Sequence, residues 1–165
     1  MRLFIAILFN DEMKDALLKM QDDMSDRGVK GNFTPEDNMH LTLAFIGDYP
    51  DPQDVLDVID ESAFRSVGLT LNGIGSFGEL RYASLQENKA LYAYVRRLRH
   101  SLADAGIPFD RKKFTPHITL IRKPFYRNAE DIAGIRIPKA SMKADHVSLM
   151  RSDRGKHGMI YTEIF

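Results

Sequence analysis

The sequence predicts an α+β fold of two lobes, each with one strand that carries the phrase His-x-Thr-Leu. Runs of β-branched and aromatic residues alternate with segments whose apolar residues recur at helical spacing. The phrase HLTL occupies residues 40–43, and HITL occupies residues 117–120. The chain has no long linker or low-complexity tract. We therefore expect residues 1–165 to form a single domain made of two pseudo-symmetric lobes.

Strands and helices are expected to alternate in the first half of the chain. Residues 2–9, RLFIAILF, have the composition of a buried strand. Asn10 is placed to cap a helix that ends at Gly28, with apolar residues on one face. Residues 38–47 form the next predicted strand, and a second helix is expected at about residues 52–63.

The second half is expected to add further strands around a third helix. Residues 66–78 and 81–87 are predicted strands. The third helix has the apolar stripe Leu91, Tyr94, Val95, Leu98 and Leu102. Residues 116–122 form a strand limited by Pro124. The segments 139–151 and 158–164 are predicted to pair as a closing hairpin.

Composition excludes several classes of protein and site. The chain has no cysteine, which excludes disulfides, thiolate zinc sites and a cysteine nucleophile. The apolar run at residues 3–9 is too short to span a bilayer and lacks a signal-peptide cleavage pattern. We expect a soluble cytoplasmic protein without a membrane partner.

The charges are unevenly distributed although the net charge is zero. Residues 1–61 carry 14 acidic and 5 basic side chains, whereas the remainder carries 9 acidic and 18 basic. The stretch from Arg111 to Arg127 has six Lys or Arg and no acid. A local positive zone of this size suits one phosphate or a strand end better than a long duplex. A solvated basic face is the alternative interpretation.

The His-x-Thr-Leu phrase is repeated more often than the amino-acid composition explains, which favours a functional site. From composition, His-x-Thr-Leu is expected about 0.02 times in this chain. Side chains alternate between the faces of a strand, so His40 and Thr42 share one face, as do His117 and Thr119. The intervening apolar residues can pack the core. If the two strands lie side by side, two imidazoles and two hydroxyls meet in one cleft.

Two imidazoles can divide the work of proton transfer. Imidazole takes or releases a proton near neutral pH, and threonine hydroxyls suit phosphate oxygens. The reaction that fits is cleavage of a P–O bond by water, with one His as base and the other as acid. A metal site is the rival interpretation, but His146 and His157 lack ligand spacing and two His are too few for zinc. We expect no metal or other cofactor.

The two phrases resemble the paired H-x-[ST]-apolar signature of the 2H phosphoesterase superfamily. Within it, the chain is similar to the bacterial and archaeal RNA 2′,3′-cyclic phosphodiesterases, once named 2′-5′ RNA ligases. RLFIAI, HLTLAFIG, FTPHITLIRKP and a closing hairpin come in the family's order. The resemblance implies a bilobal α+β fold with two antiparallel β-sheets, flanking helices and a central groove that carries the two H-x-T motifs.

The resemblance also implies a reaction and a role for each site residue. The reaction is metal-independent opening of a 2′,3′-cyclic phosphate to a 2′-phosphomonoester, on RNA ends or small nucleotides. His117 matches the general base and His40 the general acid. Thr42 and Thr119 match the phosphate-binding hydroxyls, and Arg122 matches a basic residue that helps to hold the phosphate. We expect the protein to act as a monomer.

Two further candidate residues, Phe45 and Arg122, fall on the opposite strand face from the motif His and Thr if the side chains alternate regularly. Arg122 and Phe45 each stand five residues after a motif His, so a regular strand turns both away from the His and Thr face. Arg122 lies just before Lys123 and Pro124, where the end of the strand could curl it back. Phe45 matches an aromatic residue after the first motif, but its parity assigns it to the core.

Three other functions fit the same residues. A ligase joining 2′-5′ ends would use the same acid–base pair in reverse. A small-nucleotide phosphodiesterase, for example on ADP-ribose 1″,2″-cyclic phosphate, would need the same site. An RNA- or nucleotide-binding module could keep the groove without turnover.

Overall fold

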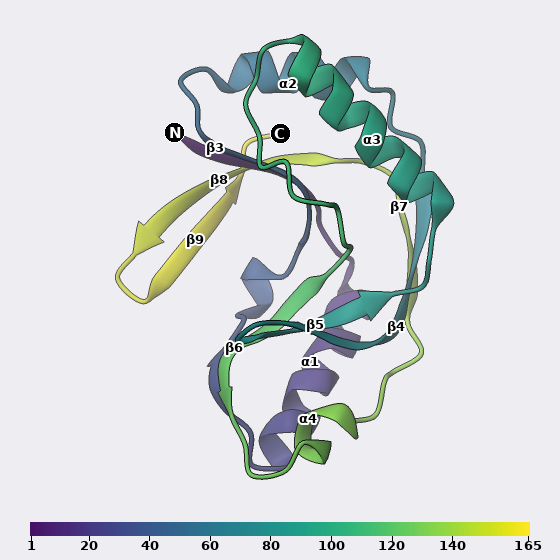
Figure 1. Cartoon of the computed structure of the whole chain (residues 1–165), viewed down its shortest axis with the longest axis vertical. Helices are drawn as coiled ribbons and strands as arrows, with labels where there is room; N and C mark the ends of the chain where they lie inside the picture. The colour runs from purple at the N-terminus through teal and green to yellow at the C-terminus, as the bar shows by residue number, and fades with distance from the viewer.

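The strands of the computed structural model, which describes residues 1–165, form two antiparallel sheets. The strands are β1 (Arg2–Ile7), β2 (Lys30–Phe33), β3 (Leu41–Asp48), β4 (Val67–Phe77), β5 (Leu80–Leu85), β6 (Ile118–Phe125), β7 (Ser141–Ala144), β8 (Ser148–Gly155) and β9 (Gly158–Glu163). One sheet has the order β3-β1-β8-β9, and the other has the order β2-β6-β5-β4-β7. The motif strands β3 and β6 thus belong to different sheets, which lie one above the other in Figure 1. The predicted α+β class with two antiparallel sheets is confirmed.

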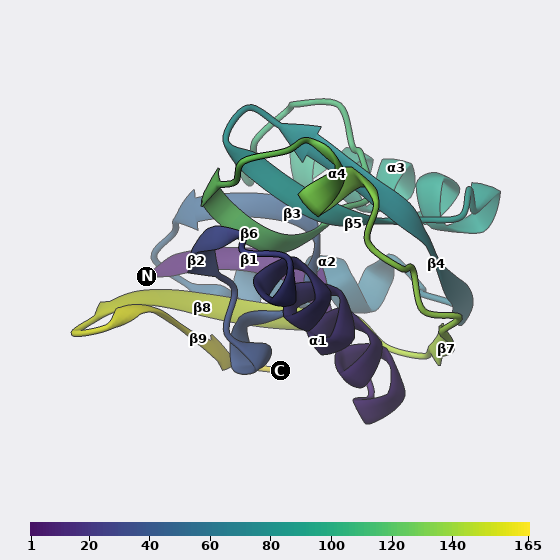
Figure 2. The same ribbon diagram turned by 90° about the horizontal axis from the view of Figure 1, so that it is seen from below.

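Helices cover the outer faces of the two sheets (Figures 1 and 2). They are α1 (Asp11–Asp26), α2 (Pro52–Glu61), α3 (Lys89–Asp104) and α4 (Glu130–Ala133), whereas the 3-10 turn η1 (Glu36–Asn38) lies beside β9 and not on an outer face. α1 packs against β6 and β7, whereas α3 packs against β3 and α2. None of the helices has the length and apolarity needed to cross a membrane.

Side-chain caps explain where the three long helices begin. The Oδ1 of Asn10 accepts a hydrogen bond from the Met13 N–H at 2.9 Å, as the sequence predicted for α1. Asp51 caps α2 and Asn88 caps α3 in the same way, at 2.9 and 3.1 Å. A capped N-terminus satisfies a backbone donor that would otherwise lack a partner.

The four-stranded sheet uses its two faces differently. Leu3, Ile5 and Ile7 of β1 are buried in the main core, on the side of the sheet that the helices cover. The alternate residues Phe4 and Ala6 belong to a separate small cluster with Met150 on the opposite face. This second face has the partly buried Phe45 and Tyr161 packed against it. An apolar, half-open face is therefore available to form one wall of a site.

The closing segment of the chain differs from its prediction. Residues 139–151 do not form one strand of a hairpin, because β7 pairs with β4 in the five-stranded sheet and β8 pairs with β1 and β9. The exposed Asp145 and His146 separate the two strands at the crossing between the sheets. The β8–β9 hairpin itself is confirmed.

Besides the 3-10 turn η1, two short elements were not predicted from the sequence. β2 has the sequence KGNF and is almost wholly exposed, and it is held by its pairing with β6. α4 spans four residues. Both are too short and too polar to have an apolar period of their own, so their structure comes from tertiary contacts.

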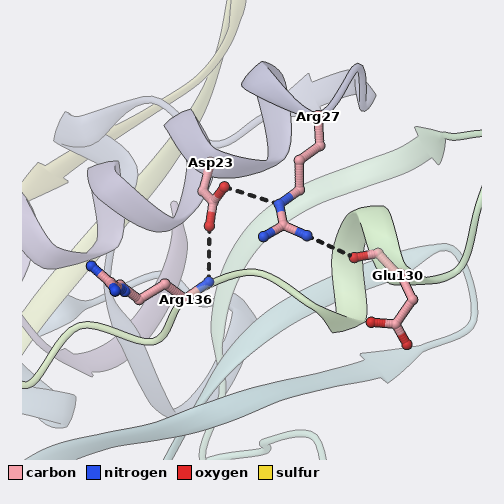
Figure 3. A network of polar contacts seen from close by, with 4 residues as sticks. All are labelled: Asp23, Arg27, Glu130 and Arg136. Carbon is pink, nitrogen blue, oxygen red and sulfur yellow. Dashed lines mark hydrogen bonds and ion pairs between the residues drawn. The ribbon is translucent and has the colours of Figure 1, made fainter.

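A polar network ties α1 to the segment around α4 (Figure 3). The Asp23 carboxylate accepts hydrogen bonds from the backbone N–H of Arg136 at 2.8 Å and from Nε of Arg27 at 3.0 Å. Nη1 of Arg27 donates to the backbone carbonyl of Glu130 at 3.3 Å. The two hydrogen bonds to the Asp23 carboxylate lower its pKa, and the one from the Arg136 backbone is the largest cause.

Replacing Asp23 with asparagine is expected to lower the free energy of unfolding by about 1 kcal/mol at neutral pH, because the charge-assisted hydrogen bonds weaken. The folded-state pKa lies below the ordinary value, so the contribution of the carboxylate is present above about pH 4 and is lost as the pH falls through the folded pKa. Urea unfolding of wild type and D23N at about pH 7 and about pH 2.5 measures this. An equal difference in stability between wild type and D23N at both pH values would contradict this role of the Asp23 carboxylate. D22N, which changes an exposed neighbouring residue, is the control.

Candidate active site

A cavity of about 760 Å³ lies between the two sheets and contains both motif histidines. Its walls come from β1, β3, β6, β8 and β9, and from the segment that includes β2 and η1. The structure brings together in this cavity all five side chains predicted for the site. They are His40, Thr42, His117, Thr119 and Arg122. The expectation that the two lobes contribute to one cleft is therefore met.

Both motif histidines are oriented by the same kind of hydrogen bond to the backbone. Nδ1 of His40 donates to the carbonyl of Asn38 at 2.7 Å, and Nδ1 of His117 donates to the carbonyl of Thr115 at 2.8 Å. In each case the acceptor stands two residues before the histidine, where the chain enters the strand. Donation from Nδ1 leaves Nε2 as the nitrogen that can exchange a proton with a ligand.

His40 lies in an apolar setting that favours its neutral form. Its ring packs against Phe4 and Tyr161, with centroids 4.9 and 5.2 Å away. Nε2 is 2.9 Å from the hydroxyl of Thr42. Burial is the main cause that lowers the pKa of His40, and the charges of His117 and Arg122 add to the effect.

His117 is placed against two aromatic rings from its own sheet but keeps Nε2 free. Phe77 and Tyr82 lie 5.1 and 5.5 Å from its ring centroid, both in edge contacts. Tyr82 fits there because Gly75 faces it, where a Cβ would collide with the tyrosine ring. Nδ1 makes the ring's hydrogen bond within the protein, so Nε2 can bind a ligand or water.

Each motif strand has a β-bulge at the same place, so the strict alternation of faces expected from the sequence does not hold beyond it. Leu43 has no partner between the pairs Ile5–Ala44 and Ala6–Thr42. Leu120 likewise has none between the pairs Arg81–Ile121 and Tyr82–Thr119. Each bulge inserts one residue after the motif threonine, so the fifth residue after the histidine returns to the histidine face.

Phe45 and Arg122 both line the cavity as a result. The assignment of Phe45 to the core was wrong, because a strand with a bulge does not keep strict alternation. Arg122 reaches the site through the bulge at Leu120, and not through a curl of the strand end before Pro124. The two lobes thus place different residues at equivalent positions, an aromatic ring in one and a guanidinium in the other.

Sequence reasoning missed the cavity residues that come from η1 and the β8–β9 hairpin. Nδ2 of Asn38 donates to the carbonyl of Met159 at 3.0 Å and so ties η1 to β9. Met159 and Tyr161 line the cavity together with His157, which was considered from the sequence only as a metal ligand. Arg2 also lines it, with its guanidinium 5.2 Å from the centre of the Phe45 ring.

The alternation of Met159 and Tyr161 in β9 was the available sequence signal for these residues, but nothing local showed which face meets the site. No group of three or more His, Cys, Asp or Glu side chains is placed to hold a metal ion. The cavity instead offers imidazole, hydroxyl, amide and guanidinium groups, which bind anions and move protons.

Comparisons with known proteins agree with this architecture. The RNA 2′,3′-cyclic phosphodiesterase of Thermotoga maritima is 28% identical, with 100% of this chain and 94% of the relative covered. That of Methanocaldococcus jannaschii is 25% identical, with 99% and 98% covered. The crystal structure of a Thermus thermophilus protein matches with a TM-score of 0.80 at 27% identity, covering 100% of this chain and 96% of that one. The structure of E. coli LigT complexed with 3′-AMP has the same fold, with a TM-score of 0.81 at 23% identity over 99% and 95% of the two chains.

A two-lobed fold that brings one His-x-Thr pair from each lobe into one cavity is that of a 2H phosphoesterase. The model of the LigT like phosphoesterase family matches the chain twice, at residues 7–85 and 83–161. The chain therefore belongs to the LigT-like phosphoesterase family. The double match also supports the internal repeat of the two lobes.

Proposed function

We propose that this protein hydrolyses the terminal 2′,3′-cyclic phosphate of RNA to a 2′-phosphomonoester, by acid–base catalysis that needs no metal. The observation that carries the proposal is the pair of histidines in one cavity, each with Nδ1 bound to a carbonyl and a threonine two residues later. The names of relatives that cover nearly the whole chain support the choice of substrate.

His117 is assigned the role of general base. Its Nδ1 is held by a backbone carbonyl, and Nε2 has no hydrogen-bond partner within the protein. A water bound there can give its proton to Nε2 while its oxygen attacks the phosphorus. The P–O bond to the 3′-oxygen then breaks.

His40 is assigned the role of general acid, which protonates the departing 3′-oxygen. A low pKa makes the imidazolium a stronger proton donor, provided that the ring is protonated when substrate is bound. The bound phosphate anion supplies the negative charge that favours protonation in this otherwise positive cavity. Protonation of His40 is thus coupled to the binding of the substrate.

The remaining groups hold the phosphate between the two imidazoles. Thr42 and Thr119 offer hydroxyls, and Arg122 offers a guanidinium with several donors. All of these groups come from one chain, which supports action as a monomer. The lack of cysteine suits a reducing compartment such as the cytoplasm.

Replacing Arg122 with glutamine is expected to lower kcat/KM by about 10–100-fold, because a charge-assisted contact to phosphate contributes about 1.5–3 kcal/mol. Steady-state hydrolysis of a nucleoside 2′,3′-cyclic phosphate measures the change. Arg127→Gln is the matched control, since this exposed residue lies in the same basic stretch but outside the cavity. Equal losses in both variants would show that Arg122 acts only through the general charge of the surface.

The proposal is tested with an oligonucleotide that ends in a 2′,3′-cyclic phosphate, incubated with the purified protein in EDTA. We expect turnover in EDTA and a product that ends in a 2′-phosphomonoester. Loss of turnover in EDTA that a divalent metal restores would overturn the mechanism. Tight binding without turnover would identify a binding module, and joining to an added 5′-hydroxyl strand in place of hydrolysis would identify a ligase.

A further inference from the structure

The two β-bulges that shape the site are each contacted by a polar side chain from a helix on the outer face. The bulge residues are Leu43 in β3 and Leu120 in β6. The carbonyl of Leu43 accepts hydrogen bonds from Arg99 of α3, and the carbonyl of Leu120 accepts one from Gln21 of α1. Different residue types on different helices thus make the same kind of contact in the two lobes.

Gln21 joins the bulge in β6 to the chain beside it. Its Nε2 donates to the carbonyl of Leu120 at 2.9 Å and to the carbonyl of Thr34 at 2.8 Å. The N–H of Thr34 also donates to Leu120 at 3.0 Å. Gln21 is only 7% exposed, and few polar residues in this protein are so deeply buried. A buried amide with both hydrogens used fixes the positions of the two carbonyls it contacts.

Arg99 joins the bulge in β3 to the loop that leads to the second motif. Nε and Nη2 donate to the carbonyl of Leu43 at 3.2 and 3.1 Å, and Nη1 donates to the carbonyl of Lys112 at 2.6 Å. The guanidinium lies 5.9 and 5.8 Å from the ring centres of Phe109 and Phe114. One side chain therefore contacts the first motif strand and the loop that precedes His117.

A bulge decides which residues face the cavity. If the extra residue were absorbed by a one-residue shift in register, every side chain beyond it would move to the other face of the sheet. Such a shift in β6 would turn Arg122 away from the phosphate, and in β3 it would turn Phe45 away. Donors that hold the bulge carbonyl oppose this rearrangement.

We propose that Gln21 and Arg99 are positioning residues of the active site. They hold the bulges that bring Arg122 of β6 and Phe45 of β3 onto the cavity face, next to Thr119 and Thr42. This inference rests on the proposed function. Neither residue lines the cavity, so any effect on the reaction passes through the strands.

The test compares R99M and Q21M with matched variants that lose similar interactions elsewhere. Arg97 lies on the same helix, donates to the carbonyls of Ser62 and Ala63 and lies over the Tyr94 ring, so R97M is the control for R99M. S62A removes a buried hydroxyl that bonds to Tyr94 and Ile59, and it is the control for Q21M. For each variant, kcat, KM and thermal stability are measured, together with the affinity for inorganic phosphate.

We expect R99M and Q21M to lower kcat by about tenfold or more with a smaller change in KM, because misplacement of catalytic groups by about 1 Å costs up to about 10²-fold. Q21M is also expected to weaken phosphate binding by about fivefold or more through Arg122. R97M and S62A should lose stability but keep kcat. R99K, which keeps the positive charge and one donor nitrogen but not the planar fork of the guanidinium, should lie between wild type and R99M.

Folded R99M and Q21M with kcat within about twofold of wild type would overturn the inference. A loss of kcat in R97M or S62A that equals the loss in the test variants would also overturn it, since the effect would then be one of general stability. If R99M does not fold, R99K decides the matter for Arg99. Lack of turnover by the wild-type protein would contradict the proposed function. The role of Gln21 would still be tested by comparing the phosphate affinities of Q21M, S62A and wild type.

Discussion

Replacing His117 with alanine is expected to lower kcat by about 10²–10⁴-fold, because a general base contributes that much to the transfer of a proton. The ring makes edge contacts with Phe77 and Tyr82 near an open cavity, so its loss leaves the main core intact. Steady-state and single-turnover hydrolysis of a nucleoside 2′,3′-cyclic phosphate measure the effect.

The matched control for this variant is His100→Ala. The His100 side chain is 77% exposed and pairs with Asp104 on α3, outside the cavity, so its removal should leave kcat unchanged. A reduction of less than about tenfold in a folded H117A protein would rule out His117 as the base.

Replacing His40 with alanine is expected to cause a loss of the same order, about 10²–10⁴-fold in kcat, because the 3′-oxygen then leaves without a proton. The two single variants should differ in how their residual activity depends on pH. With only the base present, the rate of H40A should rise as the pH is raised. With only the acid present, the rate of H117A should fall as the pH rises.

The position of the decline in H117A follows from the environment of His40. Burial lowers the pKa of His40 in the free protein, and an acid acts only in its protonated form. As the pH is raised, the kcat/KM of H117A should therefore begin to decline at a pH below about 6.5, which is the ordinary pKa of imidazole. A pH–rate profile of H117A that rises through this range would assign His40 the role of base.

Part of the site could be predicted from the sequence because it depends on spacing within one strand. The faces of His40 and Thr42, and of His117 and Thr119, follow from alternation over two residues, which a bulge further along does not disturb. The capped helix after Asn10 and the β8–β9 hairpin were also predictable, since their signals are local.

The rest could not be predicted because it depends on contacts between distant segments. The bulges at Leu43 and Leu120 are held by side chains from α3 and α1, and no pattern within β3 or β6 reveals them. The cavity residues Asn38 and Tyr161 meet His40 only because η1 and β9 dock against each other. The separation of β7 from β8 likewise depends on which sheet each strand joins.

The most direct measurement of the division of labour between the histidines uses a cyclic substrate with sulfur in place of the 3′-oxygen. A thiolate leaves without protonation, so the general acid becomes dispensable while the base does not. Wild type, H40A and H117A are compared on the oxygen and sulfur substrates. We predict that H40A comes within about tenfold of wild type on the sulfur substrate, whereas H117A stays lower by about 10²–10⁴-fold. Recovery of H117A in place of H40A, or of neither variant, would contradict the account.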